Sequence, residues 1–94
     1  MTFCIDFDGT LTEPSPYPIT GALIPERIEY VKRLKSQGHT IILHTARKWE
    51  DLDEAVKLCA EQGLVFDEVH GGKPRADKYV DDKAIAPELF FSGL

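Results

Sequence analysis

Short apolar runs alternate with amphipathic helical segments along the chain. The apolar runs indicate strands at residues 2–7, 40–45 and 64–70, with a shorter fourth strand at 78–83. The first run, TFCIDF, is almost continuously apolar, as expected for a central parallel strand that is covered on both faces. Alternating strands and helices are typical of parallel β-α units. The sequence therefore predicts an α/β fold with a small parallel sheet of about four strands.

Start and stop signals bound the predicted helices. Pro25 opens the first helix and Gly38 follows its end, and the apolar positions on its inner face are Ile28, Val31 and Leu34. The second helix is followed by Gly63, has acidic residues in its first turns, and carries apolar positions at Trp49, Leu52, Val56 and Cys59. A last helix is expected to begin at Pro87. The proline-rich residues 12–25 are expected to form a loop.

Length and composition indicate one domain, residues 1–94, of an ordinary soluble protein. No apolar run approaches the roughly 20 residues needed to cross a bilayer. The N-terminus lacks a basic leader, so a cytoplasmic location is expected. A formal net charge of -5 argues against binding to nucleic acid or a membrane surface, because both are anionic. Cys4 and Cys59 lie in apolar segments and are expected to be reduced core side chains.

Polar side chains follow each predicted strand at the point where it ends. In chain order these residues are Asp6 and Asp8, Thr45, Lys73, and Asp81 and Asp82. Parallel β-α folds bind ligands at the carboxyl ends of their strands, so these side chains are expected to meet. Four carboxylates at one edge would repel each other unless some are protonated or a cation neutralises them. The pattern therefore predicts Mg²⁺, which commonly completes its coordination with water and substrate phosphate, and a phosphorylated small-molecule substrate.

The order of these motifs resembles the haloacid dehalogenase superfamily, specifically its phosphatases. The matching stretches are DFDGTLT, IILHTAR and GGKPRADKYVDDKA, and the resemblance covers residues 3–86. It implies a three-layer Rossmann-like core and a magnesium-dependent phosphomonoester hydrolase that works through an aspartyl phosphate. Superfamily members that cleave carbon-halogen or phosphonate bonds lack the second acid of the first motif. Asp8 is present here, so phosphate esters are the expected substrates.

The resemblance also implies a role for each motif residue. Asp6 would be the nucleophile, and Asp8 would protonate the leaving oxygen and then activate water. Thr45 and Lys73 would bind the transferred phosphoryl group. The implied metal ligands are Asp6, the Asp8 main-chain carbonyl, Asp81 and Asp82, and which of the last two contacts the metal directly stays open. Residues expected to bind substrate are Gly9, Thr10, Ala46, Arg47 and Arg75, although for either arginine a surface ion pair is an equal alternative.

No stretch is long enough for the cap domain that usually sets specificity in this superfamily. The site should therefore be open, and a short sheet edge favours self-association, so a homo-oligomer is one expectation. A sugar phosphate is the leading substrate class, with a polynucleotide 3'-phosphate or a phosphoprotein as the alternative. Two functions of another class stay open. One is a receiver-like regulatory module, and the other is a phosphate- or metal-binding protein without catalysis.

Overall fold

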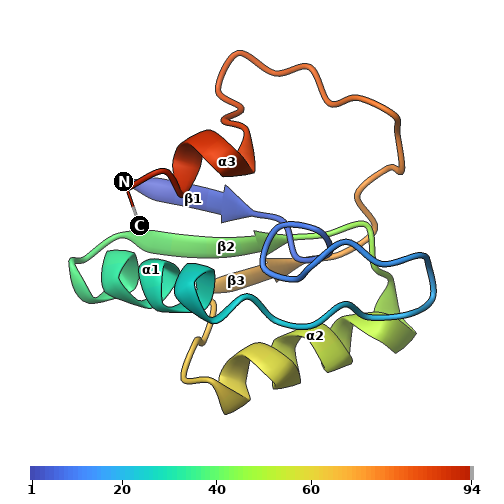
Figure 1. Cartoon of the computed structure of the whole chain (residues 1–94), viewed down its shortest axis with the longest axis horizontal. Helices are drawn as coiled ribbons and strands as arrows, with labels where there is room; N and C mark the ends of the chain where they lie inside the picture. Colours follow the sequence, from blue (N-terminus) through green and yellow to red (C-terminus); the bar gives the residue numbers. More distant parts are fainter. Residues whose placement is uncertain (94) are drawn as a thin grey trace.

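Three parallel strands form the centre of this computed structural model, which describes residues 1–93. Along the chain the elements are β1 (Thr2–Ile5), α1 (Pro25–Ser36), β2 (Thr40–His44), α2 (Trp49–Glu61), β3 (Glu68–His70) and α3 (Pro87–Phe90). The strands lie in the order β1-β2-β3 (Figure 1). Ile5 pairs with Leu43, and Leu43 pairs with Val69. The predicted α/β class and parallel sheet are confirmed.

The helix boundaries follow the signals in the sequence. α1 begins at Pro25, and Gly38 beyond its end adopts a φ of 92°. α2 ends at Glu61, and Gly63 adopts a φ of 83°. Glycine tolerates this left-handed backbone, which ends a helix, better than any other residue. Trp49, an apolar position of the predicted second helix, is 87% exposed.

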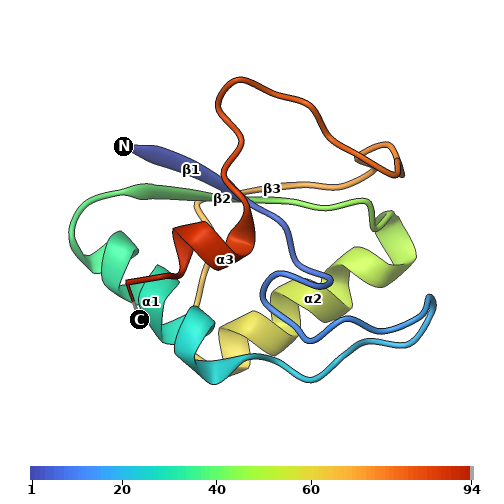
Figure 2. The ribbon, with the colours of Figure 1, turned by 45° about the horizontal axis from the view of Figure 1, so that its top comes forward.

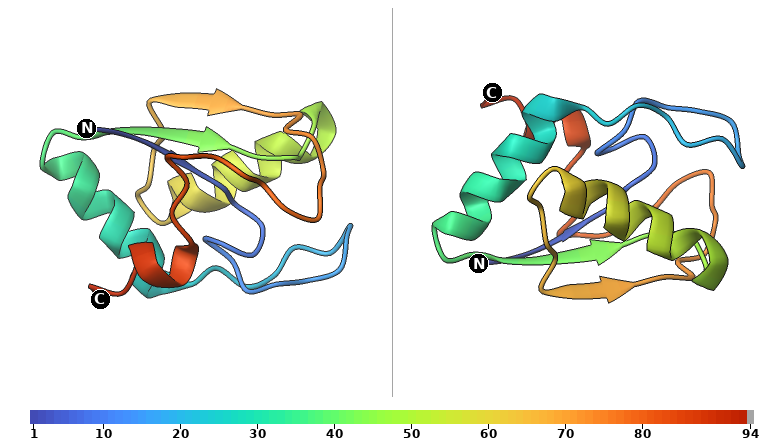
Figure 3. Two further views of the ribbon diagram at one scale, coloured as in Figure 1. Left: turned by 90° about the horizontal axis from the view of Figure 1, so that it is seen from above. Right: turned by 90° about the horizontal axis from the view of Figure 1, so that it is seen from below.

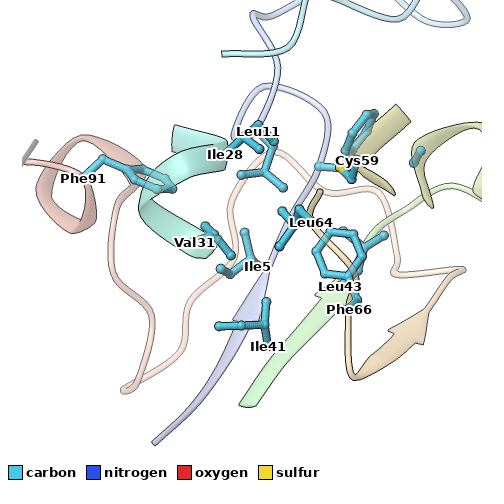
Figure 4. Packing of buried hydrophobic residues seen from close by; sticks show 12 residues of the cluster. Ile5, Leu11, Ile28, Val31, Ile41, Leu43, Cys59, Leu64, Phe66 and Phe91 are labelled. Atoms are coloured by element: carbon cyan, nitrogen blue, oxygen red, sulfur yellow. The ribbon is translucent and has the colours of Figure 1, made fainter. Parts of the chain in front are cut away.

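The hydrophobic core lies between one face of the sheet and the helices. Its buried side chains come from β1, α1, β2, α2 and adjoining segments, and include Ile5, Leu43, Val31, Cys59 and Phe91, which directly follows α3. Figure 4 shows them gathered in one cluster. In Figure 2 the helices lie on the same side of the sheet. The helices of the described residues therefore lie in one layer against the sheet. Cys4 lies on the opposite face and is exposed, so its predicted core position is wrong.

The predicted fourth strand is absent from the described residues. Residues 78–83 belong to the long connection between β3 and α3, and Val80 is 98% exposed (Figure 1). The Asp81 carboxylate accepts the Lys83 amide at 2.9 Å, and the Asp81 carbonyl accepts the Ala84 amide at 3.2 Å. These local bonds form a turn, which competes with strand pairing. Within residues 1–93, β1 therefore keeps one edge without a strand partner, and self-association stays a prediction.

The connections contain no inserted domain. Residues 46–72 form α2, β3 and their short linkers, in agreement with the expected absence of a cap. Within the described residues, none of the helices combines the length and the apolar composition that crossing a bilayer requires.

We expect Leu43→Ala to lower the free energy of unfolding by about 2–5 kcal/mol, because it leaves a cavity in a fully buried position. Urea denaturation would measure the change. Val80→Ala is the control, since its exposed side chain should contribute less than about 0.5 kcal/mol. Equal losses for the two variants would contradict this description of the core.

Candidate active site

The carboxyl ends of the three strands meet the loops that carry the predicted site residues. Figure 3 shows the strands pointing the same way, with the loop after β1, the start of α2 and the loop after β3 gathered beyond their ends. A cavity of about 210 Å³ lies here and is called the Asp6 pocket. Its lining residues are Asp6, Asp8, Thr45, Ala46, Lys73, Arg75, Ala76 and Tyr79. The structure thus brings together side chains from three separate motifs.

A tight turn after β1 presents Asp6 and Asp8. Phe7, between them, is fully buried, and its carbonyl accepts the amides of Thr10 at 3.1 Å and Leu11 at 2.9 Å. Gly9 has a φ of 76°, which only glycine adopts readily. Phe7 points into the core, while Asp6 and Asp8 on either side of it line the Asp6 pocket.

The Asp6 carboxyl group is half-buried, and this burial raises its pKa. The Phe7 backbone amide and the positive charge of Lys73 oppose that rise, whereas the nearby Asp8 adds to it. The Thr10 hydroxyl also donates a hydrogen bond to Asp6 Oδ2 at 3.4 Å. Positive charge close to Asp6 favours its ionised form, and a carboxylate can bind a cation in this way.

Thr45 and Lys73 are fixed by hydrogen bonds between the end of β2 and the loop after β3. The Thr45 amide donates to the His70 carbonyl at 3.0 Å, and the Lys73 amide donates to the Thr45 carbonyl at 3.0 Å. Gly71 lies against this junction, because a Cβ there would be 2.7 Å from the Arg47 carbonyl oxygen. The two loops therefore approach closely, and a glycine allows it.

Arg47 is buried and binds protein groups on several sides. Its guanidinium makes a bidentate pair with Asp8, with both nitrogen-oxygen distances at 2.8 Å. It also donates to Thr20 Oγ1 at 2.8 Å and to the Asp51 carbonyl at 3.1 Å, and lies 3.6 Å from Glu54. The hydrogen bonds to Asp8 raise the pKa of Arg47. Here Arg47 positions Asp8, and its contact with substrate stays a prediction.

Gly9 and Thr10, predicted to bind substrate, shape the turn beside the Asp6 pocket. The Gly9 amide donates to Thr12 Oγ1 at 3.1 Å, and Thr10 contacts Asp6. Ala46 and Arg75 line the pocket itself. Tyr79 also lines it and was not predicted from the motifs; the Lys73 ammonium lies 4.1 Å from the centre of its ring. The sequence placed Tyr79 only in the fourth strand, and no other signal marked it.

Asp81 and Asp82 do not line the Asp6 pocket. Both are exposed in the loop after β3, and the Lys83 amide lowers the pKa of Asp81. Within residues 1–93, no three His, Cys, Asp or Glu side chains are grouped closely enough to hold a metal ion. Mg²⁺, however, is commonly held by one or two carboxylates together with waters and substrate phosphate. Asp6 and Asp8 supply oxygen donors, so they fit a site in which waters and substrate phosphate complete the coordination of Mg²⁺.

We expect Arg47→Met to lower the free energy of unfolding by about 1–3 kcal/mol, because it removes charge-assisted hydrogen bonds while keeping a long side chain. Arg47→Lys should recover only part of the loss, since an ammonium cannot make the bidentate pair. Urea denaturation of the three proteins would measure this order. If Arg47→Met had the same free energy of unfolding as the native chain, the ion pair would not hold the loops together.

Comparisons with known proteins identify the family and a similar solved structure. A sequence model of the family described as haloacid dehalogenase-like hydrolase matches residues 3–89. A solved structure of a conserved protein from Bacteroides thetaiotaomicron is 32% identical, with a TM-score of 0.72, and the alignment covers 98% of this chain and 87% of that one. No curated protein matches the chain. Because the family match spans nearly all of the sequence, the chain belongs to the haloacid dehalogenase-like hydrolases.

Proposed function

We propose that this protein is a magnesium-dependent phosphomonoester hydrolase in which Asp6 is the nucleophile. The observation that carries the proposal is the Asp6 pocket, where Asp6, Asp8, Thr45 and Lys73 line one cavity. Members of this family are in general phosphohydrolases that use Mg²⁺. Carboxylates supply a nucleophile and a proton donor, and the hydroxyl and ammonium supply donors for phosphoryl oxygens.

The chemistry divides between Asp6 and Asp8. A carboxylate oxygen of Asp6 attacks phosphorus and the bond from phosphorus to the ester oxygen breaks. Asp8, released from its pair with Arg47 and in its neutral carboxyl form, gives its proton to that oxygen. Asp8 then takes a proton from a water molecule that attacks the aspartyl phosphate, and this releases phosphate and restores Asp6. During both steps Thr45 and Lys73 hold the phosphoryl oxygens. Before the reaction, Arg47 holds the Asp8 carboxylate at the pocket through the bidentate pair, and this pair must open before Asp8 can act as a proton donor.

Asp6 and the Asp8 main-chain carbonyl would hold Mg²⁺, with water and substrate phosphate as further ligands. When bound, the ion would supply positive charge beside Asp6 and the phosphoryl oxygens. Asp81 and Asp82 would join these ligands only after a change in the loop between β3 and α3, because both are exposed in that loop.

A phosphorylated small metabolite, such as a sugar phosphate, is the substrate class that we infer. The Asp6 pocket has a volume of about 210 Å³, smaller than the roughly 300–1,000 Å³ of sites that enclose drug-sized ligands. A polynucleotide would instead meet a chain with a formal net charge of -5. The receiver-like alternative expects its phosphate acceptor after the third strand, and β3 ends in His70 rather than in an aspartate.

Phosphate release from sugar phosphates, phosphoamino acids and 3'-phosphorylated oligonucleotides would test the activity. With Mg²⁺ we expect turnover, and Asp6→Asn should reduce it on the order of 10³-fold or more because the nucleophile is lost. Asp53→Asn makes the same chemical change at an exposed position of α2 outside the Asp6 pocket and is the matched control. Equal turnover in the native chain and Asp6→Asn would exclude Asp6 as the nucleophile.

A stability measurement would test the cation site independently of turnover. Because burial raises the pKa of Asp6, its ionised form lowers native stability, and this cost diminishes as pH falls through the folded pKa toward the ordinary value of 3.8. Without metal at pH 7, Asp6→Asn should therefore be at least as stable as the native chain. Mg²⁺ at 100 times its dissociation constant should stabilise the native protein by about 2.7 kcal/mol. The same stabilisation of Asp6→Asn would contradict a site built on Asp6.

A further inference from the structure

A second cavity, of about 140 Å³, adjoins the Asp6 pocket and is called the outer pocket. It shares Asp8, which is the proposed proton donor, and Arg75 with the Asp6 pocket. Its other walls come from the proline-rich loop after β1 and from the start of α2, and include Ser15, Tyr17, Ile19 and Asp51. With the phosphorus atom held in the Asp6 pocket, the leaving group bonded to the oxygen that Asp8 protonates would extend into the outer pocket.

The loop that walls the outer pocket is held in place by defined contacts. Its two limbs approach so closely that a Cβ on Gly21 would lie 2.0 Å from the Glu13 carbonyl oxygen, and the Glu13 amide donates to the Ala22 carbonyl at 2.8 Å. The Thr20 hydroxyl donates to Glu54 of α2 at 2.9 Å and accepts from Arg47 at 2.8 Å. The base of the loop that walls the outer pocket is therefore fixed, which reduces the entropy cost of binding against it.

The chemistry of the outer pocket suits a hydroxylated ring. The Tyr17 ring is 71% exposed, and the Arg75 guanidinium lies 4.8 Å from its centre. An aromatic face packs against the apolar face of a ring, while the Asp51 carboxylate accepts from hydroxyl groups and the Ser15 hydroxyl donates or accepts. These groups together match the alternating C–H and O–H surface of a sugar.

The charges around the outer pocket disfavour an anionic leaving group. Asp8 and Asp51 oppose Arg47 and Arg75, so the formal charges of its lining sum to zero. Arg47 is moreover already paired with Asp8. A second phosphate or a nucleic-acid backbone would find little net attraction there, because its binding depends on an excess of positive charge. A compact neutral group can bind there without an excess of positive charge.

We propose that the outer pocket binds the leaving group of the phosphate ester, that this group is a neutral hydroxylated ring of monosaccharide size, and that Tyr17 determines the preference for it. The inference rests on the proposed phosphatase function. Tyr17 acts by contact with the leaving group and not on the phosphoryl group, so its removal should alter which ester is preferred.

The test compares kcat/KM for a hexose phosphate with that for acetyl phosphate, whose leaving group carries no ring. Tyr17→Ala should lower the ratio of the two values about tenfold, mainly through KM for the hexose phosphate, because the lost contact is a binding contact. Tyr17→Phe keeps the ring and should keep the ratio. Trp49→Ala is the matched control, since this exposed aromatic residue lines neither pocket and should leave the ratio unchanged.

An unchanged ratio in Tyr17→Ala would overturn the inference, as would preference of the native chain for an oligonucleotide or a bisphosphate over the hexose phosphate. If the native chain hydrolyses neither ester, the proposed function fails, and calorimetry then tests the outer pocket separately. In an Asp6→Asn background, Tyr17→Ala should weaken hexose phosphate binding about tenfold. Equal affinity with and without Tyr17, or no binding by either protein, would overturn the inference.

Discussion

The bidentate ion pair between Arg47 and Asp8 joins the segments that build the site. Arg47 follows β2, Asp8 follows β1, and the same guanidinium reaches Thr20 of the proline-rich loop and the Asp51 carbonyl of α2. Because the guanidinium is nearly inaccessible to water, it needs several acceptors at once. One buried cation thus sets the position of the proposed proton donor, the loop beside it and the start of a helix.

The sheet has an open side, and this affects the site. α1, α2 and α3 cover one face, while Cys4 on the other face is exposed and β1 has no second strand partner within residues 1–93. The loop after β3 adds no strand to the sheet within residues 1–93, and Asp81 and Asp82 in this loop do not line the Asp6 pocket. The positive charge that opposes the ionisation cost of Asp6 comes from Lys73 in this arrangement.

The two adjoining pockets are built from different parts of the fold. The Asp6 pocket is built from residues directly after strands, whose positions the sheet fixes through pairs such as Ile5 with Leu43. The outer pocket depends on a loop that the sheet does not fix and that side-chain contacts from Thr20 and Arg47 hold instead. In a fold without a cap, such a loop is the nearest available wall for the part of a substrate that is not phosphate.

Apolar periodicity, helix signals and the order of polar residues after strands were readable in the sequence because each depends on neighbours close in the chain. They determined the parallel β-α fold, the boundaries of α1 and α2, and the meeting of Asp6, Asp8, Thr45 and Lys73 at one edge. Tertiary structure alone decided that Cys4 is exposed, that Arg47 pairs with Asp8, and that Tyr17 walls a second cavity. These features depend on contacts between segments far apart in the chain, and local patterns carry no information about such contacts.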